Sequence, residues 1–355
     1  MRRTLCLTTF DLADLAPARV LAETVKAAHP DWTMQAVVIE EPGWTLPDHA
    51  FTPFDCVIPA ADLAPPRFRP WIFGRDRTSA RLPVAARAIR HALAAGAEQV
   101  VYLDADSAVF HPFDFDAPFD LETGDAPVLL APQQISPSAT LPAYRDGEAA
   151  AMRLGIFSPG FLVVRDIPEG RAFADWFDTR ALRPIADGRL AGAQVEPLLC
   201  NLAPALFAGL RLVRDPGINV GSTNIAGRQL RIETDGRITV NGTPLRHFQF
   251  PRAGSPAETV MERNGRGDIA LYELAAWHKR QTARALVPEA ARQRWSFACF
   301  ADGSMVTPPI RRLWRERDDL YAAFEDPFAT GPDTFHAWLG RERPDLSGPD
   351  LSGPA

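Results

Sequence analysis

The feature that most constrains the fold is a short apolar run that ends abruptly at two carboxylates. Val100 to Leu103 are four apolar or β-prone residues in a row, and Asp104-Ala105-Asp106 follows directly. Such a run is typical of a buried central strand. In extended backbone, residues two apart point to the same side, so Asp104 and Asp106 can direct oxygens to one point. Because open α/β sheets bind ligands at the carboxyl ends of their strands, the pair predicts a binding site there.

Two like charges that converge on one point repel each other, and a hard divalent cation readily stabilises them. The same cation coordinates a diphosphate and neutralises charge that develops on it. The acidic pair therefore indicates a metal-dependent site for a nucleotide sugar.

Composition limits the class of protein. The chain has 355 residues, of which 46% are hydrophobic, and its formal net charge of −6 comes from interleaved acidic and basic residues, which argues against a nucleic-acid partner. Cys6, Cys56, Cys200 and Cys299 are far apart and favour core thiols over a disulfide frame or a zinc site. We expect a cytoplasmic protein without a membrane span. Contact with a membrane face and the oligomeric state stay open.

Alternating strand and helix patterns predict an α/β fold that opens with a βαβ unit. Strands are expected at 4–9, 34–39, 55–58, 128–131, 157–165 and 211–214, and helices at 15–28, 79–95, 172–179 and 198–206. The stretch 132–150 is expected to be a loop, of the kind that often faces a substrate. A β-hairpin is expected over 229–240, followed by a strand at 245–250 and helices at 268–285 and from 306.

Candidate site residues follow two of the predicted strands and start one of the helices. Thr8, Thr9 and Asp11 end the first strand, where a base or ribose can dock, and turn formation or helix capping explains each equally well. Arg81 lies at the start of a predicted helix, where it can contact a phosphate. A surface salt bridge explains this arginine equally well.

Three further candidates lie later in the chain. Gly160 begins a strand and permits the close approach of a ligand or of neighbouring backbone. Glu196 is either a first-turn carboxylate favoured by the helix dipole or an active-site group. His247 lies between apolar residues, where a histidine is usually a satisfied core residue. A metal ion bound by the acidic pair would lack a third ligand, which favours coordination by the neutral imidazole of His247.

At this point the sequence resembles GT-A type glycosyltransferases, related to glycosyltransferase family 8 and to similar bacterial enzymes. Tyr102-Leu103-Asp104-Ala105-Asp106 is similar to the Tyr-Leu-Asp-x-Asp metal motif (DXD motif), and residues 158–163, Ser-Pro-Gly-Phe-Leu-Val, resemble the Asn-Ser-Gly strand. Arg81-Leu82 and His247-Phe248 match the basic-Leu and His-Phe pairs. The resemblance covers about the first 255 residues. Segments 295–297, 300–304 and 326–328 are similar to C-terminal parts of bacterial homologues.

The resemblance implies a GT-A fold, a Rossmann-like mixed central sheet flanked by helices, with a mostly helical C-terminal extension. Its implied domains are 1–255 for catalysis, 256–340 for the extension and 341–355 for a disordered, low-complexity tail. It implies a hexosyltransferase-like enzyme that retains the anomeric configuration, as family 8 enzymes do. The donor would be a nucleotide-diphosphate sugar, with a UDP-sugar favoured. The acceptor would be a hydroxyl of a glycan, a lipid-linked molecule or a small molecule.

The resemblance also assigns roles to residues. Mn²⁺ or Mg²⁺ would be held by Asp104, Asp106 and His247, with Glu196, Asp104 and Asp106 catalytic. The donor would contact Thr8, Thr9, Asp11, Arg81, Asp104, Ala105 and Gly160.

Two positions depart from the family pattern. Gln249-Phe250-Pro251-Arg252 stands where the family has Gly-x-x-Lys, so either Arg252 takes the lysine's place or no residue does. Glu196-Pro197 replaces Asp-Gln, which keeps the carboxylate and loses the amide.

Two alternatives from other classes remain. An aspartate-nucleophile phosphatase fits Asp104-Ala105-Asp106-Ser107 superficially, but it needs a downstream lysine beside a late acidic pair, and Lys279 has no such pair. A non-catalytic sugar-nucleotide or glycan binder would keep the fold and the metal-binding residues. Hydrolysis of a UDP-sugar separates an enzyme from a binder.

Overall fold

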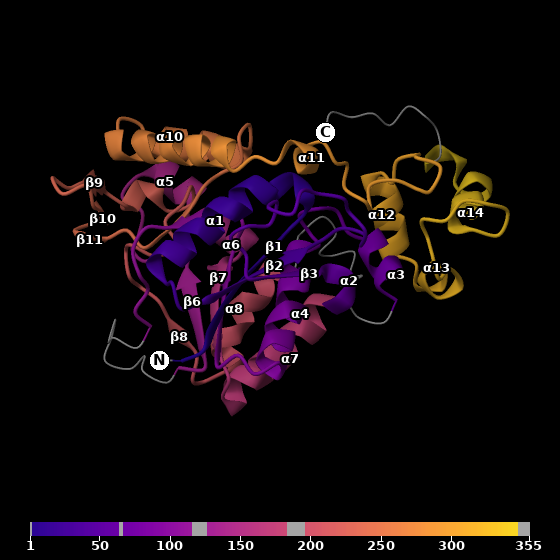
Figure 1. Ribbon diagram of the computed structural model, residues 1–355, viewed down its shortest axis with the longest axis horizontal. Helices are drawn as coiled ribbons and strands as arrows, with labels where there is room; N and C mark the ends of the chain where they lie inside the picture. The colour runs from indigo at the N-terminus through magenta and orange to yellow at the C-terminus, as the bar shows by residue number, and fades with distance from the viewer. Residues whose placement is uncertain (1, 64–66, 116–125, 183–195, 347–355) are drawn as a thin grey trace.

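The protein is built around a seven-stranded sheet. The computed structural model describes residues 2–63, 67–115, 126–182 and 196–346 (Figure 1). The strand order is β3-β2-β1-β4-β7-β6-β8. The strands are β1 (Thr4–Phe10), β2 (Thr33–Val38), β3 (Cys56–Pro59), β4 (Gln99–Leu103), β6 (Val128–Pro132), β7 (Phe157–Arg165) and β8 (Arg211–Leu212).

Strand direction makes the sheet mixed. β1 pairs in parallel with β2 and with β4, while β7 is antiparallel to both of its neighbours, β4 and β6. The predicted α/β class with a mixed central sheet is therefore confirmed. Because β7 runs opposite to β4, the start of β7 and the end of β4 meet at the same edge.

Helices cover both faces of this sheet because side chains alternate along its strands. Val100 and Tyr102 of β4 enter one hydrophobic cluster, and Val101 and Leu103 enter another on the opposite face. Figure 1 shows α1 on one side and α4, α7 and α8 on the other. These helices are α1 (Leu15–Ala28), α4 (Arg81–Ala94), α7 (Pro168–Leu182) and α8 (Glu196–Leu206).

Two smaller sheets extend the fold beyond β4. β5 (Ser107–Val109) pairs antiparallel with β12 (His247–Gln249), which brings the late strand beside the acidic pair. The other sheet has the order β11-β10-β9. Its strands are β9 (Leu230–Ile232), β10 (Ile238–Val240) and β11 (Thr243–Pro244). Asn241 and Gly242 both have positive φ, 51° and 84°, as the tight turn between β10 and β11 requires.

The C-terminal part is mostly helical, and its aromatic residues join the main core. Trp295, Phe297 and Phe335 belong to the same buried cluster as Leu7 and Tyr102 of the sheet. The helices are α9 (Pro256–Asn264), α10 (Ile269–Arg284), α11 (Pro288–Ala291), α12 (Pro308–Arg315), α13 (Asp318–Ala323) and α14 (Phe335–Glu342). Short 3-10 turns, η1 (Leu12–Asp14), η3 (Ile225–Gly227) and η4 (Pro344–Leu346), complete the described elements.

The expected loop over 132–150 is wrong, because two helices form there. α5 (Leu141–Asp146) begins where the Thr140 hydroxyl accepts a hydrogen bond from the Ala143 amide at 3.3 Å. The alanine-rich α6 (Glu148–Leu154) ends at Gly155, whose φ of +124° suits glycine.

Smaller differences lie elsewhere. α2 (Ala60–Leu63) and α3 (Phe68–Phe73) form between the strand expected at 55–58 and the helix expected at 79–95, where the sequence predicted no helix. Residues 341–346 of the expected disordered tail belong to α14 and η4, and residues 347–355 lie outside the described residues. Among the described helices, none combines the length and apolar character needed to cross a bilayer.

Candidate functional site

The sheet has a crossover point between β1 and β4. After β1 the chain builds β2 and β3 on one side, and it then returns to place β4 on the other side of β1. In open α/β sheets, ligands bind in the crevice outside the carboxyl ends of the strands at this reversal. Asp11 follows β1 and Asp104 follows β4, so the fold brings the two predicted stretches to this edge.

Asp104 is fixed in place directly after β4. Its amide donates to the Gly160 carbonyl at 3.1 Å, and its Oδ1 accepts a hydrogen bond from the Tyr102 hydroxyl at 2.7 Å. Burial raises the pKa of this carboxyl, and the Tyr102 hydrogen bond and the charge of Arg81 oppose the shift without reversing it. A cation at this position would favour the charged form.

Gly160 faces Asp104 across the β4–β7 pairing. A Cβ atom added here would overlap both Asp104 Oδ2 and the side-chain nitrogen of Gln249. Gln249 in turn lies 3.2 Å from the Ser158 hydroxyl. The close approach that the sequence predicts at Gly160 therefore exists, with side chains as the approaching groups. Gln249 was not predicted as a site residue, because it is one polar residue in an apolar strand.

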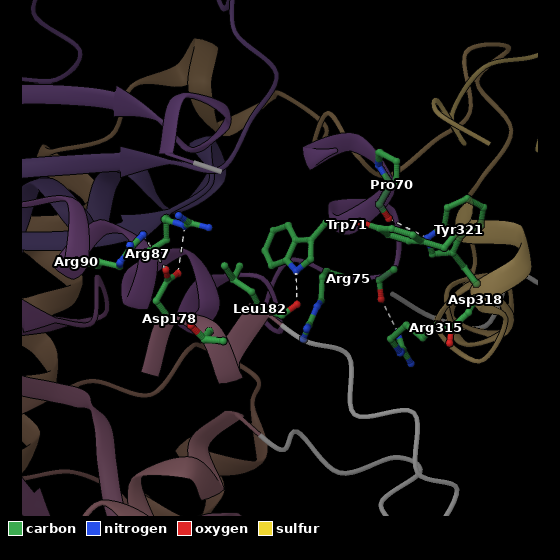
Figure 2. A pocket seen from close by; sticks show the side chains of 13 residues that line it. Pro70, Trp71, Arg75, Arg87, Arg90, Asp178, Leu182, Arg315, Asp318 and Tyr321 are labelled. Atoms are coloured by element: carbon green, nitrogen blue, oxygen red, sulfur yellow. Dashed lines mark hydrogen bonds and ion pairs between the residues drawn. The ribbon is translucent and has the colours of Figure 1, made fainter. Parts of the chain in front are cut away.

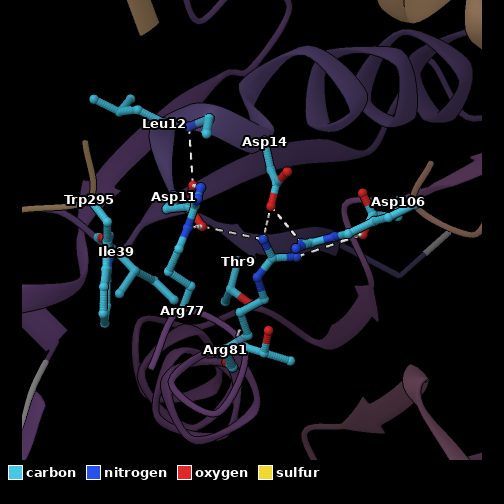
Figure 3. Close-up of polar contacts among 12 residues, drawn as sticks. Thr9, Asp11, Leu12, Asp14, Ile39, Arg77, Arg81, Asp106 and Trp295 are labelled. Carbon is cyan, nitrogen blue, oxygen red and sulfur yellow. Dashed lines mark hydrogen bonds and ion pairs between the residues drawn. The ribbon is translucent and has the colours of Figure 1, made fainter. Parts of the chain in front are cut away.

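Asp106 lies two residues on, and arginines hold its carboxylate. Its Oδ2 accepts a hydrogen bond from Arg252 Nε at 3.1 Å and lies 3.8 Å from Arg81 Nη1. Arg252 also donates to Asp14 Oδ2 at 2.6 Å, so it bridges the segments after β12 and before α1. Figure 3 shows the Arg81 side chain directed toward Asp14, with Asp106 beside it. Arg252, which is at the departure from the family pattern, is thus part of the site.

Arg81 is at the centre of this charge network. It is the first residue of α4, its side chain is 12% exposed, and its guanidinium bonds to Asp14 and approaches Asp11 at 3.4 Å. Burial lowers the pKa of this guanidinium, but the attraction of Asp14, Asp106 and Asp11 outweighs burial and raises it. Arg81 therefore forms buried ion pairs, not the surface salt bridge of the alternative.

Asp11 caps η1 and binds a second arginine. Its Oδ1 accepts from the Ala13 amide at 3.1 Å, which is the capping role that the sequence allowed. Arg77 grips both carboxylate oxygens, with 3.0 Å between Nε and Oδ2. Burial raises the pKa of Asp11, yet the Arg77 hydrogen bonds and the charge of Arg81 outweigh it and lower the pKa. No pattern in the sequence indicated a role for Arg77.

Thr8, Thr9 and Ala105 are buried at this edge. Thr9 Oγ1 lies 3.2 Å from the Tyr102 hydroxyl and 3.3 Å from the Arg81 carbonyl. The Thr8 hydroxyl has no hydrogen-bond partner among the described residues. Ala105 is 1% exposed between the two carboxylates. Their roles in donor binding stay predictions.

His247 lies on β12 opposite Val109 and is fully buried. Neither ring nitrogen has a hydrogen-bond partner in the described part of the chain. His247 is therefore not a core histidine with satisfied hydrogen bonds. Phe161 packs beside the ring, with 5.6 Å between centroids. Burial lowers the pKa of His247 to about 3, and the imidazole is therefore neutral at pH 7.

These groups fit a divalent cation by chemistry, although they are not gathered as a finished metal site. Among the described residues, no three or more His, Cys, Asp or Glu side chains are placed to hold an ion together. Carboxylate oxygens with a neutral imidazole that has no other partner are nevertheless ligands that Mn²⁺ accepts. Arg252 occupies Oδ2 of Asp106, so a cation at that oxygen competes with Arg252.

Glu196 is the first residue of α8, and its side chain lies outside the described part of the structure. The helix starts near the edge that carries Asp104, because the Pro197 carbonyl is 3.3 Å from the position of a Cβ added to Gly155. Both roles considered for Glu196 stay predictions.

Comparisons with known proteins give likenesses of fold. No family model and no curated protein sequence matches the chain. The galactosyltransferase LgtC, solved with donor and acceptor sugar analogs, is 19% identical with a TM-score of 0.46, over 81% of this chain and 99% of that one. An active-site mutant of LgtC gives 19% identity and a TM-score of 0.45 over the same shares.

A glycosyltransferase involved in glycosylating the major capsid of PBCV-1 is 11% identical, with a TM-score of 0.38, over 74% of this chain and 98% of that one. These three solved structures are glycosyltransferases. At these TM-scores and identities, the likeness does not show what this chain binds or transfers.

Proposed function

We propose that this chain transfers a glycosyl group from a nucleotide-diphosphate sugar, with a UDP-sugar favoured, to a hydroxyl of a glycan, lipid-linked or small-molecule acceptor. The observation that supports this most is the position of Asp104 and Asp106 at the carboxyl end of β4, beside the crossover point of the sheet. A pair of carboxylates there needs a cation, and Arg81 and Arg252 supply cationic groups for an anionic ligand in the same crevice.

The residues of the chain divide the work as follows. Asp104, Asp106 and His247 are the proposed ligands of Mn²⁺ or Mg²⁺, which when bound supplies positive charge to the leaving diphosphate. Arg81 and Arg252 would donate hydrogen bonds to phosphate oxygens, since guanidinium groups match phosphate geometry. Thr8, Thr9, Asp11, Ala105 and Gly160 would line the donor side of the crevice.

Glu196 is the proposed acidic group near the anomeric carbon. A carboxylate at the first turn of α8 would stabilise the positive charge that develops on the sugar ring as the leaving group departs. Family 8 enzymes retain the anomeric configuration, and we extend retention to this chain as part of the proposal. Replacement of Glu196 by Gln tests the role, because the variant should still bind UDP while transfer falls.

The cysteines and the division of the chain into parts support a proposed compartment and domain organisation. All four cysteines are free, as a reducing, cytoplasmic setting would keep them. We propose that residues 1–255 contain the catalytic machinery and that residues 256–340 support it by packing.

Hydrolysis of UDP-sugars with and without Mn²⁺ tests the proposed function. A transferase leaks some turnover to water, so slow, metal-dependent release of UDP is expected from the wild-type chain and not from Asp106→Ala. Absence of release with every nucleotide sugar that binds would contradict transfer.

A non-catalytic binder is the second candidate, and one observation favours it. Arg252 and Arg81 already lie beside Asp106, so this carboxylate has cationic partners without a metal. A binder would bind nucleotide sugar with equal affinity in EDTA and in Mn²⁺ and would release no UDP. The phosphatase alternative has less support, because Lys279 is exposed on α10. Turnover of a generic phosphate monoester would revive it.

A further inference from the structure

A second pocket, of about 520 Å³, lies away from the crossover point. Its lining comes from α4 and α7 at one end and from α3, α12 and α13 at the other (Figure 2). Its volume is in the range of small-ligand sites. It shares α4 with the site described above, but it contains none of the residues proposed there.

One wall of this pocket is aromatic and held rigidly. The Trp71 indole donates to the Leu182 carbonyl at 3.0 Å, and the Trp314 indole donates to the Pro70 carbonyl at 2.8 Å. Tyr321 and Leu182 are part-exposed beside them. The two indoles are 7% and 2% exposed and both N–H groups are used, so Tyr321 and Leu182 supply the accessible apolar surface of this wall, which suits the C–H face of a sugar ring.

The opposite end of the pocket carries charge. Arg87 Nε lies 3.1 Å from Asp178 Oδ1, and Arg90 Nη1 lies 3.6 Å from Asp178 Oδ2. Two guanidinium groups thus share one carboxylate whose side chain is 5% exposed. Asp175 also binds Arg90, but it is 62% exposed and therefore screened by water.

Arg87 retains donors for a ligand. Its one ion pair among the described residues is at Nε, which makes no hydrogen bond to Asp178, and no hydrogen bond from its terminal nitrogens is found in that part of the chain. Its side chain is 22% exposed, and Figure 2 shows it beside Asp178 at the pocket's edge. Terminal guanidinium nitrogens bind a carboxylate in bidentate fashion.

Acceptor groups for hydroxyls complete the lining. Asp318 is the first residue of α13 and is exposed at the mouth. Thr179 gives its hydroxyl proton to the Asp175 carbonyl at 2.7 Å, which leaves its oxygen lone pairs as acceptors. Several neutral hydroxyls on a ligand would satisfy these acceptors.

We propose that this pocket binds an acidic monosaccharide unit, a hexuronic acid, free or within a glycan. The carboxylate pairs with Arg87 and Arg90, the ring packs on the aromatic wall, and the hydroxyls bond to Asp318 and Thr179. A fatty acid would leave Asp318 and Thr179 unmatched.

Titration of the full chain with glucuronic acid, followed by saturation-transfer NMR and calorimetry, tests this. Binding of glucuronic acid is expected, with glucose at least about tenfold weaker because it lacks the charge-assisted hydrogen bonds. Arg87→Gln should weaken glucuronic acid by about tenfold or more, whereas Arg263→Gln, whose ion pair with Asp146 lies elsewhere, should not. Tyr321→Ala, on the opposite wall, is the second variant should Arg87→Gln not fold.

Equal binding of glucose, preference for uridine monophosphate or decanoate, or unchanged binding by both variants would overturn the proposal. Binding of glucuronic acid should persist in EDTA and in Asp106→Ala. Failure of the pocket proposal can therefore be distinguished from failure of the proposed transfer activity.

Discussion

Arg252 donates from Nε to the Asp106 carboxylate at 3.1 Å, across 146 positions of sequence. The same guanidinium reaches Asp14 at 2.6 Å. In this arrangement the acidic residue proposed to bind a metal is neutralised by the chain itself. A donor diphosphate competes with Asp106 for Arg252, and a metal competes with Arg252 for Asp106. Donor and metal should therefore bind cooperatively.

Arg252→Gln tests this exchange of partners. Without the guanidinium, Asp106 is free to bind an ion, so Mn²⁺ affinity in the absence of nucleotide should rise by about tenfold, a change of about 1.4 kcal/mol. UDP affinity should fall, because a cation for phosphate is lost. Calorimetry measures both. Arg237→Gln, which breaks an exposed pair with Asp235, is the control. Unchanged Mn²⁺ affinity would show that Arg252 does not restrain Asp106.

Asp106→Ala should abolish metal-dependent stabilisation by nucleotide sugar. A ligand at about 100 times its Kd stabilises the folded state by about 2.7 kcal/mol, which a thermal-shift assay detects. We expect this stabilisation from a UDP-sugar or GDP-sugar with Mn²⁺ in the wild type, and none in EDTA or in Asp106→Ala. Asp235→Ala, in an exposed turn, should behave as the wild type. A shift that survives in Asp106→Ala would remove this residue from the site.

Gly160→Ala should disturb the site and the sheet together. The new Cβ would overlap Asp104 Oδ2 and the Gln249 amide, and overpacking of this kind costs about 1–3 kcal/mol. Urea unfolding should show this loss, and nucleotide binding should weaken. In contrast, Gly340 lies in α14 with nothing within 4 Å of an added Cβ, so Gly340→Ala should be neutral or stabilising by up to about 1 kcal/mol. Equal stability of the two variants would contradict the packing at Gly160.

His247 should make the metal-free protein less stable in acid. Its folded pKa of about 3 lies below the unfolded value of about 6.5, so the unfolded chain binds a proton that the folded chain does not. The free energy of unfolding contributed by this residue is fully present above about pH 6.5. It falls as the pH drops toward 3, by about 1.4 kcal/mol per pH unit at most.

Urea unfolding in EDTA at several pH values between 4 and 7 measures this slope. His247→Leu should have a shallower pH dependence than the wild type. His49→Leu, at an exposed histidine, should keep the wild-type slope. Identical slopes for all three proteins would show that His247 is not held neutral.

Phe335→Ala should test whether the C-terminal helices share the main core. Phe335 is fully buried, with ring centroids 4.9 Å from Trp314 and 5.4 Å from Phe73. Truncation of such a ring costs about 3–5 kcal/mol. A single unfolding transition should shift as a whole, since Phe73 belongs to the body of the protein. Tyr272→Ala, at a 51% exposed position, should stay within about 0.5 kcal/mol. A separate early transition would instead show that the C-terminal helices unfold on their own.

Most of the fold could be predicted because the decisive patterns are local. The apolar run before Asp104 became β4, and the periodic stretches became α1, α4 and α10 close to their expected ends. The helices α5 and α6 were missed because proline and scattered polar residues obscured a short alanine-rich period. The solved structures that are similar to this chain include glycosyltransferases, while glycosyl transfer and membership of family 8 stay predictions.

The charge network of the site could be predicted only in part. Asp104, Arg81 and Asp11 each end or begin an element, so the rule on carboxyl ends of strands placed them at one edge. Their pairing with Arg77 and Arg252 depends on how loops after α3 and β12 fold back, over separations of 66 and 146 positions. Pairwise contacts of that range leave no periodic trace in a single sequence.

The reversed direction of β7 has a consequence for how specificity can change. Since this strand enters the sheet from the ligand edge, the chain between β6 and β7, with α5 and α6, departs from and returns to that rim. The length and composition of this segment can therefore change without a change in the strands of the central sheet. Exchange of residues 133–156 would therefore alter this rim while the paired strands β1 and β4 stay the same.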